Sequence, residues 1–457
     1  MSNFNTQKKM ETKMKKAEKF SKTITWKAVL IGVITLLLLI PGAMIEELIR
    51  ERKMRSEETI AKINDVWSND QTLTGPVLVI PYETTTVDNK KNTVIQRHYL
   101  HYAPEALKMN GKLIPEIRHY GIYTSILYKS DLQIEGSFPS IDFSKIPNSR
   151  IVWDEAVVRI GISDLRGVTN NPDFILGGRH FSSEAGGSND DVIGTGLVIG
   201  LKNFSAVDAS QKLTFTCPLK LKGSNSINFV PVGKTTNVKL SGAWSAPGFT
   251  GSFNPEHNIT DKDFHAKWNV LHFNRNIPER WVDKSVASFD ETVFGVNLVN
   301  VVDHYQQNER SAKYAIMFIL LTFVVFFFVE IFTGVKVHPI QYLLVGLALI
   351  LFYSLLLSLS EQIGFGLAYL VASTAIIGMI SLYAKSVFKS PRQSGILVLI
   401  LAALYTYLYV VIQIEDIALL VGSIGLFIIL GIIMFVSGKI NWYKSALPSE
   451  EELAEEE

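Results

Sequence analysis

The chain has 457 residues, 47% of them hydrophobic and 19% charged, and a formal net charge of +1 at pH 7. This near-neutral balance argues against nucleic acid as the main partner, and the single cysteine, Cys217, excludes an intrachain disulfide. Because much of the chain is polar, a mean hydropathy of +0.21 requires several strongly apolar segments elsewhere.

The chain begins with a polar, lysine-rich segment at residues 1–27. A positively charged flank before an apolar run predicts a cytoplasmic tail. Residues 28–45, AVLIGVITLLLLIPGAMI, form that run and predict the first transmembrane helix. The alternative is a cleaved signal peptide with its cleavage site at residues 41–43. A retained anchor is favoured, because the preceding tail is long and a helical pattern continues beyond the run.

That continuation, residues 46–69, predicts an amphipathic helical stalk. Its apolar residues recur at helical spacing. They are Leu48, Ile49, Ile60, Ile63 and Trp67.

Residues 70–312 predict a large β-rich domain. Short runs in which apolar and polar residues alternate are separated by Gly, Pro, Asn and Asp. Cys217 lies in such a run and is interpreted as a small buried hydrophobe rather than a reactive thiol. The stretches 177–191 and 246–261 are expected to be loose loops. The clearest alternating runs are 132–138, 158–162, 213–221, 238–244 and 266–272.

Residues 313–437 predict a five-helix membrane domain, which gives a six-helix transmembrane bundle with the first helix. An even number of spans puts both termini on one side of the membrane. The short loops with basic residues then fall on the side of the termini, and the acidic ones on the other, so the termini are predicted to be cytoplasmic and the β-rich domain extracytoplasmic. The predicted spans are 314–332, 340–359, 363–383, 395–413 and 417–436.

The charges that carry this orientation lie in short segments. On the side of the termini they are Lys336, His338, Lys385, Lys389, Arg392, Lys439 and Lys444; on the opposite side they are Glu361, Glu415 and Asp416. Arg50, Arg52, Lys53 and Arg55 disagree with the rule, but acidic residues flank them and large domains translocate largely regardless of charge. Residues 438–457 predict an acidic cytoplasmic tail.

The β-rich domain offers little that is typical of catalysis. Gly233-Lys234-Thr235 imitates the end of a phosphate-binding loop, but position 228 is Asn where that loop requires Gly. Two histidine groups are expected to lie on ordinary strand surface, although convergence in space would allow a metal site. No cofactor, metal or catalytic residue is predicted, and the protein is predicted not to be an enzyme. The two groups are His98, His101 and His119, and His257, His265 and His272.

The membrane half holds the sharper candidates. Glu330 is an acid inside a predicted span, which marks a functional site by default, unless it reaches the interface or pairs with Lys336 or His338. His338 and Pro339 predict a helix start, because proline suits the first helical position. Glu361 is expected at the outer rim, where docking of the β-rich domain and simple solvation are equally open.

Several motifs resemble the CreD (Cet) family of bacterial inner-membrane proteins. The most specific is HPIQYLLVGL at residues 338–347, which includes Gln341 and Tyr342; TGP at 74–76, GIYT at 121–124 and DLRG at 164–167 are similar to the same family. The resemblance covers most of the chain beyond residue 45. It implies an inner-membrane protein with a broad role in cell-envelope integrity and stress tolerance. Its expected partners are membrane lipid and further envelope proteins.

Two other functions stay open. A ligand-binding sensor would signal from the β-rich domain through the bundle. A transporter usually carries charged residues or broken helices at mid-membrane, whereas the predicted span centres here are apolar. Small residues in the 364–378 segment favour close helix packing instead. The sequence leaves the oligomeric state open.

Overall fold

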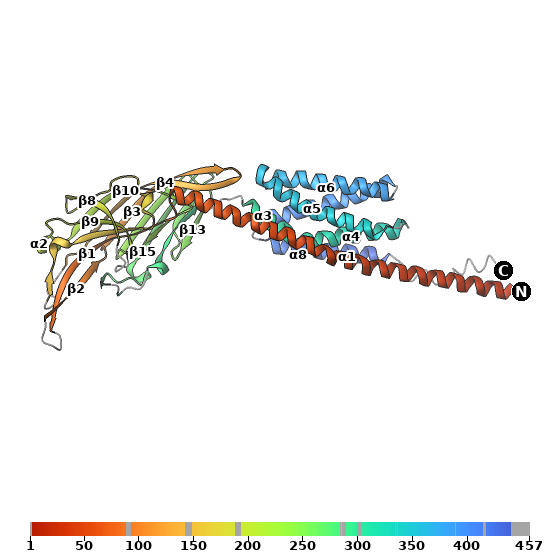
Figure 1. Ribbon diagram of the computed structural model, residues 1–457, viewed down its shortest axis with the longest axis horizontal. Coiled ribbons are helices and arrows are strands. Elements are labelled where there is room, and N and C mark those ends of the chain that lie inside the picture. Colours follow the sequence, from red (N-terminus) through yellow and green to blue (C-terminus); the bar gives the residue numbers. More distant parts are fainter. Residues whose placement is uncertain are drawn as a thin grey trace. The chain divides into compact units, whose positions relative to one another are not determined.

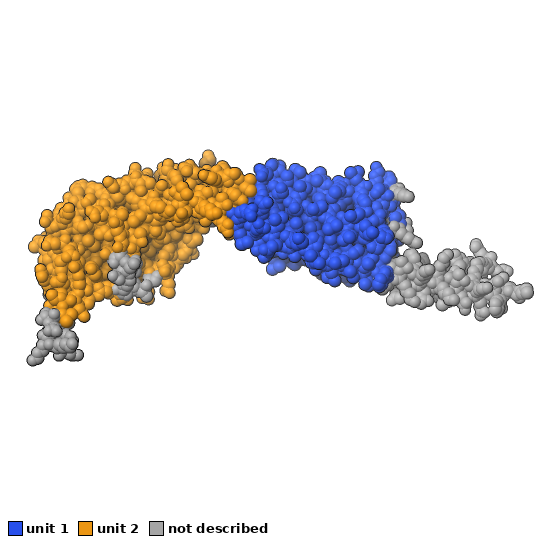
Figure 2. Space-filling view, in the orientation of Figure 1, with its two compact units in different colours: residues 1–55, 303–457 blue, residues 56–302 orange. Residues whose placement is uncertain are grey.

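A computed structural model describes residues 2–87, 93–141, 149–187, 193–283, 285, 289–298, 303–333, 335, 337–388, 390–414 and 417–439. The chain forms two compact units (Figure 2). One, here called the helical unit, contains Met1–Arg55 and Asp303–Glu457; the other, the β unit, contains Ser56–Val302. The finer domain boundaries predicted from the sequence stay predictions.

Helix α1 (Ser2–Trp67) is continuous over 66 residues and contains Pro41. It carries the apolar run and continues through the stalk, so one element belongs to both units (Figure 1). The prediction that the helix extends past the apolar run is confirmed. Continuity follows from the sequence, since Pro41 is the only proline before Pro76 and no glycine follows Gly42 until Gly75.

Five further helices of the helical unit are long and apolar enough to cross a membrane, which together with α1 makes six in the described part of the chain. The predicted six-span architecture is confirmed. A short polar helix, α3 (His304–Lys313), precedes them. The five apolar helices are α4 (Ala315–Thr333), α5 (Pro339–Ile363), α6 (Phe365–Phe388), α7 (Pro391–Gln413) and α8 (Ala418–Gly438).

Some of the charges used to predict the orientation lie outside the described residues, as do 440–457 of the predicted tail. These charges are Lys336, Lys389, Glu415, Asp416 and Lys444.

Besides the end of α1, the described residues of the β unit contain seventeen strands, one short α-helix, α2 (Ala206–Ala209), and four 3-10 turns. The predicted β-rich domain is therefore confirmed. The strands are β1 (Gln71–Val87), β2 (Thr93–Tyr102), β3 (Ala106–Tyr120), β4 (Tyr123–Phe138), β5 (Ser149–Ile151), β6 (Val157–Ile162), β7 (Asp173–Leu176), β8 (Arg179–Gly187), β9 (Thr195–Gly200), β10 (Leu213–Ser224), β11 (Ser226–Val230), β12 (Thr235–Gly242), β13 (Pro247–Gly251), β14 (Glu256–Ile259), β15 (Phe264–Leu271), β16 (Arg280–Val282) and β17 (Phe294–Leu298).

These strands form two layers that share one core (Figure 1). One layer runs β14-β15-β12-β3-β4-β10-β7, and the other runs β9-β6-β1-β11-β17-β13. Strand β8 pairs with both β7 and β9 and so joins the layers. At the other end, aromatic rings link the layers: Trp268 of β15 lies 5.5 Å from Phe294 of β17 and 5.9 Å from Phe249 of β13, centroid to centroid.

Two expectations about loops are wrong in their described parts. Most of 177–187 is strand β8, which turns back from β7 at Gly177 and Gly178, whose φ values of +55° and +79° favour glycine. The 246–261 segment contains strands β13 and β14. These strands contain many polar and small residues, so they lack the alternation by which a strand is recognised in sequence. Residues 188–191 lie outside the described residues.

Cys217 is a buried residue of β10, as predicted. Burial raises the pKa of its thiol to about 12, because the thiolate would lose its hydration; the nearby Asp173 acts in the same direction. The thiol is therefore protonated at physiological pH and packs as an apolar side chain.

Candidate functional site

Glu330 near the end of α4 is a buried acid that receives hydrogen bonds from three sides. It forms an ion pair with Lys27 of α1. Its Oε2 accepts a hydrogen bond from the Tyr342 hydroxyl of α5 at 3.2 Å, and its Oε1 accepts one from the Val337 backbone N–H at 3.2 Å. We call these four residues the Glu330 cluster. It joins α1, α4, α5 and the α4–α5 connection.

The sequence predicted that Glu330 could pair with Lys336 or His338, whereas its partner in the structure is Lys27. His338 is engaged elsewhere, and Lys336 lies outside the described residues. Lys27 is more than 300 positions away in the chain and is one of many lysines in its segment, so nothing in the sequence singles it out. A charged carboxylate in a low-dielectric site needs an opposite charge and hydrogen bonds to replace its lost hydration, and Glu330 has both.

Helix α5 begins as predicted, with Pro339 in the first turn. His338 is its N-cap: Nδ1 accepts a hydrogen bond from the Ile340 N–H at 3.3 Å, and the Gln341 side chain accepts one from the His338 N–H at 2.8 Å. These reciprocal bonds form a capping box, so His338 and Gln341 have a structural role at this helix end.

The HPIQYLLVGL segment also packs against α1 through Gly346. A Cβ at this position would lie 2.2 Å from Cδ1 of Leu38 and 2.9 Å from the Phe323 ring. Leu38 of α1 is itself almost fully buried. One motif therefore supplies a polar contact through Tyr342 and an apolar contact through Gly346, about one helical turn apart.

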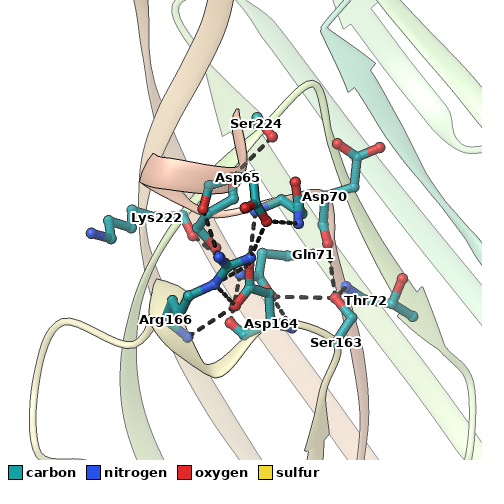
Figure 3. Close-up of polar contacts among 11 residues, drawn as sticks. Asp65, Asp70, Gln71, Thr72, Ser163, Asp164, Arg166, Lys222 and Ser224 are labelled. Atoms are coloured by element: carbon teal, nitrogen blue, oxygen red, sulfur yellow. Dashed lines mark hydrogen bonds and ion pairs between the residues drawn. The ribbon is translucent and has the colours of Figure 1, made fainter. Parts of the chain in front are cut away.

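The C-terminal end of α1 is held in the β unit by Arg166 (Figure 3). The guanidinium donates to the Asp65 carboxylate at 2.9 Å, to the Asp65 backbone carbonyl at 2.6 Å and, through Nε, to Asp164 Oδ1 at 2.9 Å. Asp164 also accepts the Asn69 N–H at 2.9 Å. We call Asp65, Asn69, Asp164 and Arg166 the Arg166 cluster. It fixes the last turn of α1 to the loop that follows β6.

Gln71 extends this cluster into the core of the β unit (Figure 3). Its buried amide donates to Ser68 Oγ at 2.8 Å and to the backbone carbonyls of Asp164 at 2.9 Å and Lys222 at 3.2 Å. A Cβ on Gly167 would lie 2.2 Å from that amide nitrogen and 2.4 Å from the Lys222 carbonyl. Only glycine fits here, which explains the last residue of the DLRG motif.

Ionised carboxylates and contacts between cations and the Trp67 ring also stabilise the attachment of α1 to the β unit. The Arg166 hydrogen bonds lower the pKa of the Asp164 carboxyl to about 2 and also lower the pKa of Asp65. Both carboxylates are therefore ionised at physiological pH. The Trp67 ring lies 4.4 Å from the Arg118 guanidinium carbon and 4.8 Å from Lys222 Nζ, distances at which cations are attracted to an indole face.

Glu361 contacts α3, the helix that leads into α4. Its Oε1 accepts a hydrogen bond from the Tyr305 hydroxyl at 3.0 Å, and the neighbouring Ser360 Oγ accepts one from Asn308 Nδ2 at 2.7 Å. Three basic residues of α1 and α3 pair within or between these helices: Arg50 with Glu47, and both Lys53 and Lys313 with Glu309.

The histidines of the β unit have separate partners. His98 contacts Asp283 at 2.9 Å, and His119 contacts Thr124 at 3.2 Å. His101 corrects the expectation of strand surface, because it is buried and stacks on Trp281 at 5.1 Å between centroids. Over the described ranges, no group of three or more His, Cys, Asp or Glu side chains could hold a metal ion.

The segment that imitates the end of a phosphate-binding loop is hydrogen-bonded to an arginine side chain of the same chain. The buried Arg275 guanidinium donates to the Gly233 carbonyl at 3.1 Å through Nε and to the Val232 carbonyl at 2.8 Å.

His257 and His265 line an open groove of about 550 Å³ over strands β3, β12, β14 and β15. Lysine and amide side chains line it as well: Asn110, Lys239, Asn258 and Lys267.

Comparison with known proteins agrees with this architecture. A family model described as inner membrane protein CreD matches residues 23–443. The chain is also 33% identical over 428 residues to "Inner membrane protein CreD" of Escherichia coli (strain K12). The aligned region covers 93% of this chain and 94% of that relative. The family match over residues 23–443 includes all six apolar helices of the described chain and the whole β unit.

Proposed function

Because the chain belongs to the CreD family of inner-membrane proteins, we propose that it contributes to cell-envelope integrity and stress tolerance as a non-enzymatic structural or interaction protein. The observation that carries this is α1, one helix bonded at Lys27 within the helical unit and at its last turn within the β unit. The Glu330 cluster holds it in the helical unit and the Arg166 cluster holds it in the β unit. Such a connection suits a protein whose function requires a soluble domain kept at the membrane.

The proposal includes an orientation. The β unit would face the periplasm and both termini the cytoplasm, supported by the basic residues of the short loops on the side of the termini. Single cysteines at Asn3, Ser188 and Lys389, in a Cys217→Ser background, test it with a membrane-impermeant maleimide on spheroplasts. We expect labelling at position 188 only. Labelling at 389 without labelling at 188 would reverse the orientation.

The functional test is complementation in cells that lack the native protein. Full-length protein should restore resistance to envelope-directed agents, whereas a fragment cut after Asn308, which retains α1 and the β unit, should not. Immunoblotting must show that the fragment accumulates in the membrane. Full restoration by the fragment would contradict the proposal, because the remaining five apolar helices would then be dispensable.

A second candidate is an extracytoplasmic sensor, favoured by the groove of about 550 Å³ on the β unit. Its lining of amides, imidazoles and lysines can donate several hydrogen bonds to a polar ligand. Native mass spectrometry of the full-length protein would detect a co-purified small molecule. Loss of that molecule in a Lys239→Ala variant, and not in a Lys262→Ala variant outside the groove, would favour the sensor.

A further inference from the structure

One face of α3 is polar and directed into the helical unit. His304, Gln307, Asn308 and Ser311 are spaced three and four positions apart, so they lie together on one side of the helix. Asn308 and Ser311 are only 1% and 0% exposed. We call these four residues the α3 polar face. A buried helix face is ordinarily apolar, which makes this face unusual.

Each of the four residues has a buried polar atom without a hydrogen-bond partner within the described ranges: His304 Nε2, Gln307 Oε1, Asn308 Oδ1 and Ser311 Oγ. The amide of Asn308 is oriented by its own bonds, since Nδ2 donates to the His304 carbonyl and to Ser360 Oγ, both at 2.7 Å. Its Oδ1 is therefore an available acceptor. Buried polar atoms are normally satisfied, so four such atoms on one face indicate a bound group.

The surroundings of this face favour a positive charge. The last turn of α5 carries Ser360 and Glu361, and the carboxyl end of a helix has a partial negative charge. Arg310 lies about 160° around the helix from Asn308 but only about 60° from Gln307, at about 100° per residue, so it borders one edge of the face and not its centre. Lys313 pairs with Glu309 at 2.9 Å. Burial lowers the pKa of His304, against the opposing effects of Asp303 and Glu361, so its imidazole is neutral at pH 7 and does not repel a cation.

The donor set decides which cation fits. Carboxamide and hydroxyl oxygens are hard ligands without charge, which suit an alkali cation better than a transition metal. We propose that the α3 polar face, together with the last turn of α5, forms a binding site for a monovalent cation, Na⁺ or K⁺, with Gln307 Oε1, Asn308 Oδ1 and Ser311 Oγ as ligands. The site would hold the polar α3 against the apolar helices that follow it.

Thermal unfolding of the full-length protein in detergent, at equal ionic strength in NaCl, KCl or choline chloride, tests the proposal. We expect a Tm several degrees higher in at least one alkali salt than in choline chloride. Equilibrium binding of ²²Na⁺, with K⁺ as competitor, should be saturable. Ser311→Ala and Gln307→Leu should each raise the half-saturating concentration about tenfold.

Two further variants separate a lost ligand from a damaged fold. Ser373→Ala removes a buried hydroxyl of α6 that donates to the Leu370 carbonyl at 3.2 Å, and it should leave the cation response unchanged. Asn308→Asp adds a carboxylate to the site and should tighten cation binding, a gain that misfolding cannot produce. Equal Tm values in all three salts without saturable ²²Na⁺ binding would overturn the proposal and leave water to satisfy the face. Unchanged binding in Ser311→Ala and Gln307→Leu would also overturn it, by placing the ion elsewhere.

Discussion

Helix α1 is held at Lys27 and at its last turn by the same type of interaction in contrasting environments. At Lys27 the partner Glu330 is buried among apolar helices, whereas the side chains of Asp65 and Arg166 are each more than half exposed. A buried pair is costly to break, because the remaining charge has lost its water. An exposed pair depends on geometry, and Arg166 supplies it through several directed hydrogen bonds to two aspartates.

This contrast predicts the largest effect at Glu330. Glu330→Gln would leave the partly buried Lys27 beside a neutral amide and should destabilise the helical unit by about 3 kcal/mol, the lower end of the cost of breaking a buried pair. Thermal unfolding in detergent measures the loss, and membrane abundance should fall with it. The matched control is Glu309→Gln, which removes an exposed acid paired with Lys53 and Lys313. A Glu330→Gln protein as stable as the wild type would show that the pair contributes nothing.

Gly167→Ala should give the next largest effect, in the β unit. The new Cβ would lie 2.4 Å from the Lys222 carbonyl oxygen, which is backbone and cannot turn away. Overpacking of this kind costs about 1–3 kcal/mol, and the upper end is expected here. Urea unfolding followed by β-sheet circular dichroism measures it. Gly178→Ala tests a glycine with open space around it, so a loss there reflects only its positive φ.

Gly346→Ala should have a smaller effect of the same kind in the helical unit. The atom nearest the new Cβ is Cδ1 of Leu38, the end of a side chain that can change rotamer. A cost near 1 kcal/mol follows, at the lower end of the overpacking range. The double variant Leu38→Ala with Gly346→Ala should recover part of the loss. If the two changes are simply additive in thermal unfolding, α1 does not pack on Gly346.

Sequence patterns predicted the parts of this molecule that depend on local chemistry. Apolar length gave the six spans, alternation gave strands such as β6, β10 and β15, and the His338–Pro339 pair gave the start of α5. The polar sites depend on contacts between distant positions. Lys27 and Glu330 are 303 positions apart, and Arg166 and Asp65 are 101 apart. The sequence marked Glu330 as an acid inside a span, and the DLRG and HPIQYLLVGL motifs lie in these regions. None of these signals identified Lys27 or Asp65 as a partner.

The last prediction concerns acid, and it tests the contact that Arg166 makes with Asp164. Asp164 has a folded-state pKa of about 2 against a usual 3.8, because Arg166 stabilises its ionised form. A lowered pKa gives stability that is fully present above the unfolded value and is lost as the pH falls through the folded one. The stability difference between wild type and Asp164→Asn should therefore be constant above about pH 5 and shrink as the pH falls toward 2. Urea unfolding at several pH values measures it, with Asp173→Asn, an exposed acid paired with His180, as the control. A difference that stays constant down to pH 2 would mean that Arg166 does not hold the Asp164 carboxylate in solution.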